Sequence, residues 1–128
     1  RIRMVTLYQI AGAKKGIVVG TGNKVEDYGI GFYTKYGDGG VDIAPIADLY
    51  KTEVRELGGH LGVDALIIDA KPTDGLWDDG RTDEDQIGAT YAELEEAMEN
   101  GTGKAVDILY KFNNKNNHKM QPIPTFKL

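Results

Sequence analysis

The chain has 128 residues, a formal net charge of −5 and a hydrophobic fraction of 41%, which fits one soluble domain and argues against general nucleic-acid binding. It contains no cysteine, so disulfides and thiolate metal sites are excluded. No apolar run approaches the roughly 20 residues that cross a bilayer, and no signal-peptide core is visible. The sequence therefore predicts a cytoplasmic protein without a membrane partner.

The first predicted elements are a helix and a short strand. Residues 1–13 carry apolar side chains close to helical spacing, and Gly12 or Gly16 can end that helix. The β-branched run 17–19 comes directly before Gly20 and predicts a buried strand.

A helix, a loop and a second strand are expected next. Thr21 or Asn23 can cap a helix that runs through Tyr28. Residues 34–40 are too rich in glycine for a regular element, and residues 41–43 resume an extended conformation before a proline.

The rest of the chain predicts helices around a loop. Asp48 is expected to cap a helix over residues 49–61. Residues 72–85 contain few apolar side chains and predict a mobile loop. Two helices are expected over residues 90–99 and 103–111.

The predicted strands are too few for a stable sheet. A β-sheet usually needs three or more strands, whereas this sequence offers two short ones. The fold class we expect is therefore α/β, with these residues forming the C-terminal part of a larger domain.

Charge is unevenly distributed along the chain. Acidic residues dominate positions 74–99, where Arg81 is the only base. Lysines dominate from Lys104 onward, so residues 113–128 are expected to form a basic tail that could meet a phosphate-bearing partner.

The stretch GTGNKVEDYG, at residues 20–29, does not complete a known phosphate-binding loop. The fingerprint G-x-G-x-x-G needs glycine where this chain has Val25, so a site for hydride transfer from NAD is poorly supported. The sequence Gly103-Lys104 lacks the first glycine of a Walker A loop.

Several motifs in a fixed order give a specific resemblance. The segments GTGNKVED, FYTKYGDGGVD, PIADLYKTEVREL, PTDGLW and TDEDQIGATYAELE resemble the ammonia-dependent NAD synthetases. The resemblance implies the C-terminal part of a doubly wound, parallel-sheet domain of the adenine-nucleotide-hydrolase-like (Rossmann-like) type. It also implies a homodimer.

The activity that the resemblance implies is a ligase reaction in NAD biosynthesis. ATP adenylates the nicotinate carboxylate of deamido-NAD, pyrophosphate leaves, and ammonia then displaces AMP to give NAD. The two polyanionic substrates call for cations, and Mg²⁺ is the implied metal ion.

The resemblance assigns roles residue by residue. Thr21, Lys51 and Thr73 resemble ATP contacts, Lys51 and Asp38 resemble catalytic residues, and Glu26 resembles the magnesium ligand. The residues that resemble the deamido-NAD side are Arg1, Arg3, Lys35, Asp38, Asp42, His118 and Lys119. Without the resemblance, Thr21 would be a helix cap and Asp38 a turn residue.

Two further expectations concern a loop over the site and a motif that the chain lacks. Residues 73–85 correspond to the mobile loop that covers the family's active site. The family's pyrophosphate loop, SGGxDS, has no match in this sequence, so the chain is expected to be a C-terminal part that is inactive alone. The alternatives are another adenylating amide ligase of the same fold, or a non-catalytic nucleotide-binding or assembly module.

Overall fold

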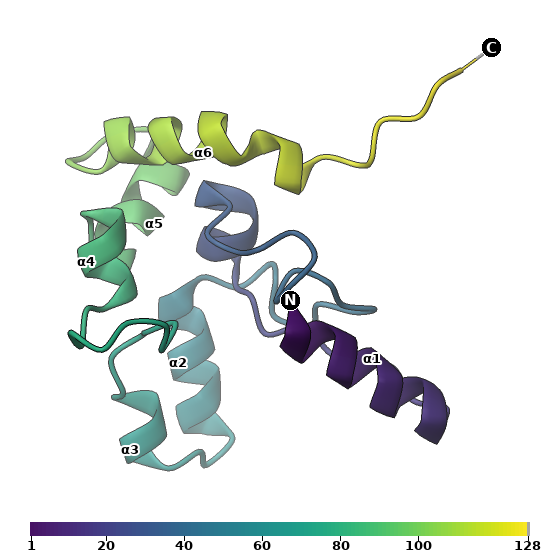
Figure 1. Ribbon diagram of the computed structural model, residues 1–128. Helices are drawn as coiled ribbons and strands as arrows, with labels where there is room; N and C mark the ends of the chain where they lie inside the picture. Colours follow the sequence, from purple (N-terminus) through teal and green to yellow (C-terminus); the bar gives the residue numbers. More distant parts are fainter. Residues whose placement is uncertain (128) are drawn as a thin grey trace.

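The structure is a computed structural model that describes residues 1–127 and is built from helices (Figure 1). In chain order these are α1 (Ile2–Lys14), η1 (Val25–Ile30), α2 (Lys51–His60), α3 (Ala65–Ile68), α4 (Asp83–Ile87), α5 (Tyr91–Asn100) and α6 (Val106–Met120). η1 is a π-helix. Within residues 1–127, no helix combines the length and the apolar character needed to span a membrane.

The core lies between η1, α5 and α6. Val25 and Ile30 of η1 and Leu94 of α5 are fully buried. In Figure 1, α6 runs along the top of the molecule, with η1 and α5 beneath it. Burial removes these apolar side chains from water and stabilises the packing of the helices against one another. The three helices therefore form the frame on which the surrounding loops are held.

The expected parallel sheet is reduced to one bridge in the part of the chain that the structure describes. Val19 and Ile43 form an isolated parallel bridge. The amide of Gly20 donates to the Ile43 carbonyl over 2.7 Å, and the amide of Asp42 donates to the Val18 carbonyl over 2.9 Å. The two predicted extended segments therefore pair in parallel, but they are too short to count as strands.

The prediction that residues 17–19 form a buried strand is wrong in its burial. Val18 is 7% exposed, whereas Ile17 and Val19 are 60% and 53% exposed. A strand of a parallel sheet is buried on both faces because helices cover them. Here only one side of the segment is covered by other residues of the chain.

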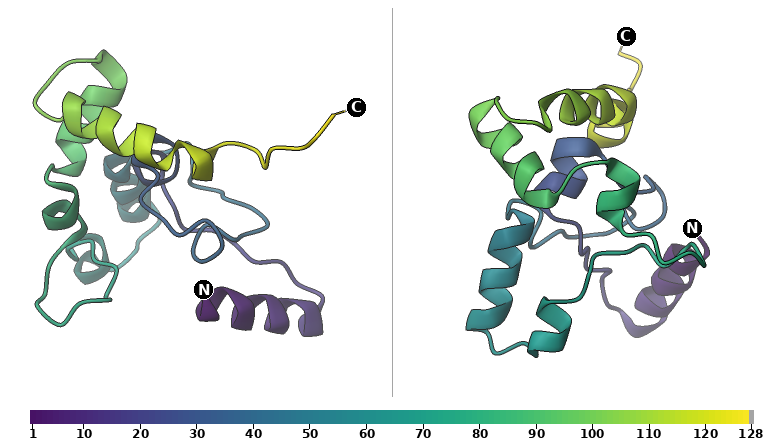
Figure 2. Two further views of the ribbon diagram at one scale, coloured as in Figure 1. Left: turned by 45° about the horizontal axis from the view of Figure 1, so that its top comes forward. Right: turned by 90° about the vertical axis from the view of Figure 1, so that its left-hand side faces the viewer.

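α1 has the predicted position but not the predicted end. Its left-handed C-cap is Lys15, with φ 55°, and the amide of Gly16 donates to the Ala11 carbonyl over 2.8 Å. None of its residues is buried. Figure 2 shows α1 lying apart from the other helices, so the apolar side chains of Ile2 and Val5 face solvent.

The helix at η1 starts with a reciprocal cap. The amide of Glu26 donates to the Asn23 side chain over 3.1 Å, and the amide of Asn23 donates to the Glu26 carboxylate over 3.3 Å. Asn23, and not Thr21, therefore caps this helix. Gly31, the residue after η1, adopts φ 60° and has no room for a Cβ beside Asn116.

The start of α2 differs from the prediction. The helix begins at Lys51, and the carboxylate of Glu53 accepts a hydrogen bond from the Tyr50 amide over 2.7 Å. Asp48 does not cap it, because it lies two residues before the N-cap Tyr50; its exposed carboxylate lies 3.3 Å from the Lys24 ammonium instead. The predicted cap was wrong because residues 45–48 form a turn, which delays the start of the helix to Lys51.

The last helices also depart from the sequence prediction. α4 lies partly inside the predicted loop 72–85, and the Thr82 hydroxyl accepts from the Asp85 amide to cap it. α5 matches its prediction. α6 begins at Val106 and continues to Met120, so the asparagine-rich residues 113–117 and the first part of the predicted tail are helical.

Candidate functional site

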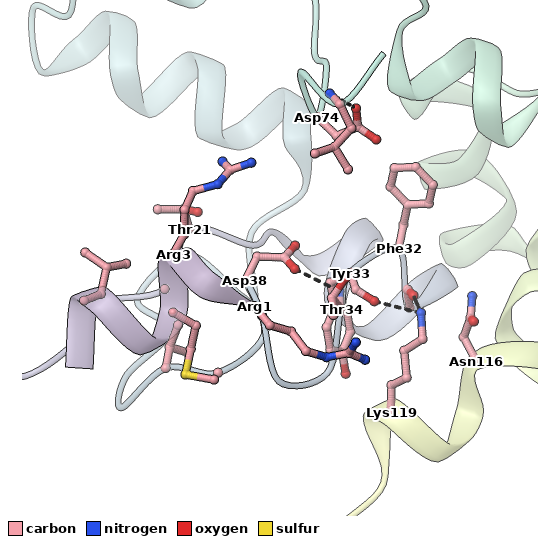
Figure 3. A pocket seen from close by; sticks show the side chains of 18 of the residues that line it. Arg1, Arg3, Thr21, Phe32, Tyr33, Thr34, Asp38, Asp74, Asn116 and Lys119 are labelled. Carbon is pink, nitrogen blue, oxygen red and sulfur yellow. Dashed lines mark hydrogen bonds between the residues drawn. The ribbon is translucent and has the colours of Figure 1, made fainter. Parts of the chain in front are cut away.

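An open cavity of about 780 Å³ lies between α1, α6 and the connecting loops. Figure 3 shows Arg1, Arg3 and Asp38 on one side of it and Asn116 and Lys119 on the other. Of the site residues that the sequence predicts, those that line the cavity are Arg1, Arg3, Thr21, Asp38, Thr73 and Lys119. Residues far apart in the sequence therefore surround one space. The arrangement places positive groups at both ends of it, which suits an anionic ligand.

Asp38 lies in the glycine-rich turn at the cavity wall. One of its carboxylate oxygens accepts a hydrogen bond from the Thr34 amide over 2.9 Å, drawn as a dashed line in Figure 3. The side chain is exposed and keeps its second oxygen free of a protein partner within the described residues. A carboxylate with this geometry can accept a proton from, or bind, a cation in the cavity.

α6 positions the cavity wall through polar side chains on one face. Asn113 donates to the Gly29 carbonyl over 2.9 Å, and the buried Asn116 donates to the Ile30 carbonyl over 2.8 Å. Lys119 donates to the carbonyls of Gly31 at 2.8 Å and Tyr33 at 2.7 Å. Gly29 and Ile30 are the last residues of η1, and Gly31 and Tyr33 come after it. Carbonyls at the end of a helix lack an internal partner, and α6 supplies donors to them.

Lys119 therefore has a structural role as well as a position at the cavity. Its ammonium can donate three hydrogen bonds, and two go to backbone carbonyls. Burial lowers its pKa, although the nearby Asp38 acts in the opposite direction. Only the remaining N–H is available to a ligand.

Three other predicted site residues do not line the cavity. The Lys35 ammonium donates to the His118 carbonyl over 2.7 Å, so these two residues tie the glycine-rich turn to α6. The Asp42 carboxylate accepts from the Val18 amide over 2.7 Å and from the Tyr8 hydroxyl over 3.2 Å. Asp42 therefore holds α1 against the bridged segments.

Glu26 and Lys51 form a separate, partly buried cluster with Tyr91. The Lys51 ammonium lies 3.0 Å from one Glu26 oxygen, and the Tyr91 hydroxyl donates to the same oxygen over 2.6 Å. Burial, with the charge of Glu26, raises the pKa of Tyr91 well above its ordinary value, so the hydroxyl stays a donor. The other Glu26 oxygen accepts from the Asn23 amide. Tyr91 was missed because nothing in the sequence links it to Glu26.

Asp83 is a second residue that the sequence did not single out. It is 8% exposed, and its Oδ1 has no hydrogen-bond partner. Burial and the nearby Glu26 raise its pKa. Among residues 1–127, however, no group of three or more acidic or histidine side chains is arranged to hold a metal ion.

Asp27 should make stability depend on pH. Burial first, then repulsion from Glu26 and Asp38, raises its pKa from 3.8 to about 6. The folded state thus keeps this proton to a higher pH than the unfolded chain does. The free energy of unfolding is therefore expected to fall as pH rises from about 4 through about 6.

The variant Asp27→Asn should remove this loss. Because Asp27 is only partly buried and solvent screens its charge, we expect a gain of about 1 kcal/mol at pH 7 and little change at pH 3. Urea denaturation at both values measures it, with the exposed Asp78→Asn as control. An equal effect of Asp27→Asn at both pH values would contradict the assignment.

Comparison with known proteins finds similarity to the NAD synthases. The family model described as NAD synthase matches residues 1–124. An NH3-dependent NAD+ synthetase from Methanococcoides burtonii is 52% identical over 99 residues, which are 77% of this chain and 37% of that protein. One from Finegoldia magna is 41% identical over 128 residues, covering 99% of this chain and 52% of that protein. The chain thus spans about half the length of the curated relatives it matches, or less.

Two solved structures resemble this one over almost its full length. An NMN synthetase from Francisella tularensis superposes with a TM-score of 0.92 at 38% identity, covering 99% of this chain and 53% of that one. An NH3-dependent NAD synthetase from Campylobacter jejuni, in complex with nitrate, gives a TM-score of 0.70 at 26% identity, with coverage of 98% and 52%.

Proposed function

The chain belongs to the NAD synthase family, and from this premise we propose that it forms part of an ammonia-dependent NAD synthetase. The observation that carries the proposal is the cavity, which brings together cationic residues from both ends of the chain and the carboxylate of Asp38. That arrangement suits a phosphate-bearing substrate beside a group that accepts a proton.

The proposed reaction amidates deamido-NAD. The nicotinate carboxylate attacks the α-phosphorus of ATP, the bond to the β-phosphate side breaks, and pyrophosphate leaves. Ammonia then attacks the acyl carbon, AMP leaves with the bonding electron pair, and NAD remains. Arg1, Arg3 and Lys119 would bind the dinucleotide, with Asp38 accepting a proton from ammonium.

The ATP side of the proposal rests on Thr21, Thr73 and Lys51. Thr21 and Thr73 line the cavity, and their hydroxyls suit phosphate oxygens. Lys51, a partly buried cation beside Glu26, would neutralise charge on the phosphates as a compact point charge. Its catalytic role is part of this proposal.

Mg²⁺ is compatible with this site through Glu26. Magnesium commonly uses one or two protein carboxylates and takes its other oxygens from substrate phosphates and water. Glu26 supplies one such carboxylate, although its oxygens now bind Lys51, Tyr91 and Asn23. When bound, the ion would neutralise phosphate charge.

The larger fold is also part of the proposal. We infer that the Val19–Ile43 bridge belongs to a doubly wound parallel sheet whose other strands lie outside residues 1–128, since Ile17 and Val19 are largely exposed. The exposed apolar side chains of α1 are consistent with a homodimer. We also propose that residues 73–85 form a mobile loop over the site. Residues 113–128 would form a basic tail, whose first part lies in α6. The proposed location is the cytoplasm.

A second substrate is favoured by one observation. The structure superposes better on the NMN synthetase than on the Campylobacter jejuni NAD synthetase. The same two chemical steps on nicotinate mononucleotide, which lacks the adenylyl half of deamido-NAD, would give NMN.

The test is an amidation assay on the protein at the length at which the source organism produces it. The protein is incubated with ATP, Mg²⁺ and ammonium and either deamido-NAD or nicotinate mononucleotide, and the amide products are separated by chromatography. NAD as the faster product supports the first proposal, and NMN supports the second. An amide from neither acid would favour another adenylating ligase or a non-catalytic nucleotide-binding module.

Residues 1–128 alone are expected to form no product in the same assay. The physical reason is that the SGGxDS segment, which would supply phosphate-binding amides, has no match in this sequence. Product formation by residues 1–128 at the rate of the chain from the source would contradict this expectation.

A further inference from the structure

Tyr91 of α5 contacts both Lys51 and its partner Glu26. The ring of Tyr91 lies 5.0 Å from the Lys51 ammonium, which is the geometry of a cation–π contact. The Tyr91 hydroxyl donates to the Glu26 oxygen that also accepts from Lys51. One side chain therefore holds both the cation and its counter-ion.

Glu95 acts on the same lysine through the backbone. Its carboxylate accepts from the Thr52 amide over 3.2 Å and from the Thr52 hydroxyl over 2.6 Å. Thr52 is the residue after Lys51, at the start of α2. The first amides of a helix have no internal partner and attract negative charge. Glu95, which is 8% exposed, thus fixes the first turn of α2 from a neighbouring helix.

The two contacts come from one face of one helix. Tyr91 and Glu95 are separated by one helical turn, so their side chains point in the same direction. A lysine has a long, flexible side chain, and holding it in one place costs conformational entropy. A ring beside the ammonium and an anchored helix start would reduce that cost before any substrate binds.

We propose that Tyr91 and Glu95 are positioning residues that hold Lys51 for the phosphates of ATP. The inference rests on the proposed function for its substrate, whereas the placement of Lys51 itself follows from the contacts above. Tyr91 acts directly on the side chain and on Glu26, and Glu95 acts through the first turn of α2.

The test compares Tyr91→Phe and Glu95→Gln with the control Glu99→Gln, a residue of α5 that is exposed. Both test variants keep the shape of the side chain, and Tyr91→Phe keeps the ring. In the amidation assay on the chain as its source produces it, each should raise KM for ATP about tenfold, the effect of losing one hydrogen bond to a charged group. KM for the acid substrate should change less than twofold.

A second measurement does not depend on activity. The proteins, without substrate, are treated briefly with acetic anhydride, and acetylation of Lys51 is compared by mass spectrometry with that of the exposed Lys104. A less restrained Lys51 should react several times faster in Tyr91→Phe and in Glu95→Gln, and at an unchanged rate in Glu99→Gln. The thermal midpoint is recorded for every variant.

The outcomes separate the two proposals. If the unsubstituted protein forms no amide, the proposed function fails, and the acetylation rates still decide whether Lys51 is positioned. A lower thermal midpoint with unchanged Lys51 reactivity, and an unchanged KM for ATP where activity exists, would mean that these residues only stabilise the fold. That result would overturn the inference.

Discussion

Replacing Glu26 by alanine is expected to lower the free energy of unfolding by about 4 kcal/mol, because removing one partner of a partly buried ion pair leaves the other uncompensated. The side chains of Glu26 and Lys51 are 16% and 24% exposed. The Tyr91 hydroxyl and the Asn23 amide would lose an acceptor as well. Urea denaturation at pH 7 measures the change.

The control for this prediction is the double variant Glu26→Ala/Lys51→Met. Once the lysine charge is gone, the missing carboxylate leaves no buried cation, so the double variant should be more stable than Glu26→Ala alone. The single variant Lys51→Met completes the comparison. If the effects of Glu26→Ala and Lys51→Met simply add in the double variant, the ion pair contributes no coupling energy and the prediction fails.

Replacing Gly31 by alanine is expected to cost about 3 kcal/mol of stability. The position has φ 60°, where a side chain is strained by about 1–2 kcal/mol. A Cβ would also lie 2.6 Å from the Asn116 Cβ, so α6 would have to move away from η1. The hydrogen bonds from Asn116 and Lys119 to the end of η1 would weaken with that shift.

Gly101→Ala separates the two causes. Gly101 has φ 66°, yet a Cβ there would meet no atom within 4 Å. We therefore expect a loss of about 1 kcal/mol from the backbone term alone. Equal losses for Gly31→Ala and Gly101→Ala, measured by urea denaturation, would show that the contact between η1 and α6 is not tight.

Helices with local signals were predicted well. Thr90 and Glu93 form the reciprocal cap that starts α5, and both residues can be recognised in the sequence. α1 likewise follows from its apolar spacing. The prediction failed where two signals lay close together, as at Asp48, because the chain first turns at residues 45–48 and the helix begins only at Lys51.

The predicted helix was shorter than α6, because the last part of α6 is stabilised by contacts with residues far away in the sequence. A run of asparagines has low helix propensity. In the folded chain Asn113 and Asn116 instead bind the carbonyls of Gly29 and Ile30, the last two residues of η1, across sequence separations of 84 and 86 residues. The spacing of Asn113, Asn116 and Lys119 on one helical face was visible, but their partners were not.

By itself, the sequence determined the family, most helices and the types of residue that the candidate site contains, because motifs, caps and apolar spacing are local properties of the chain. The tertiary structure decided which of those residues share a cavity, that Lys119 binds the backbone, and that Tyr91 reaches Glu26 across 65 residues. Such contacts depend on how η1, α5 and α6 pack together. Packing joins side chains whose separation in the sequence carries no sign of their proximity.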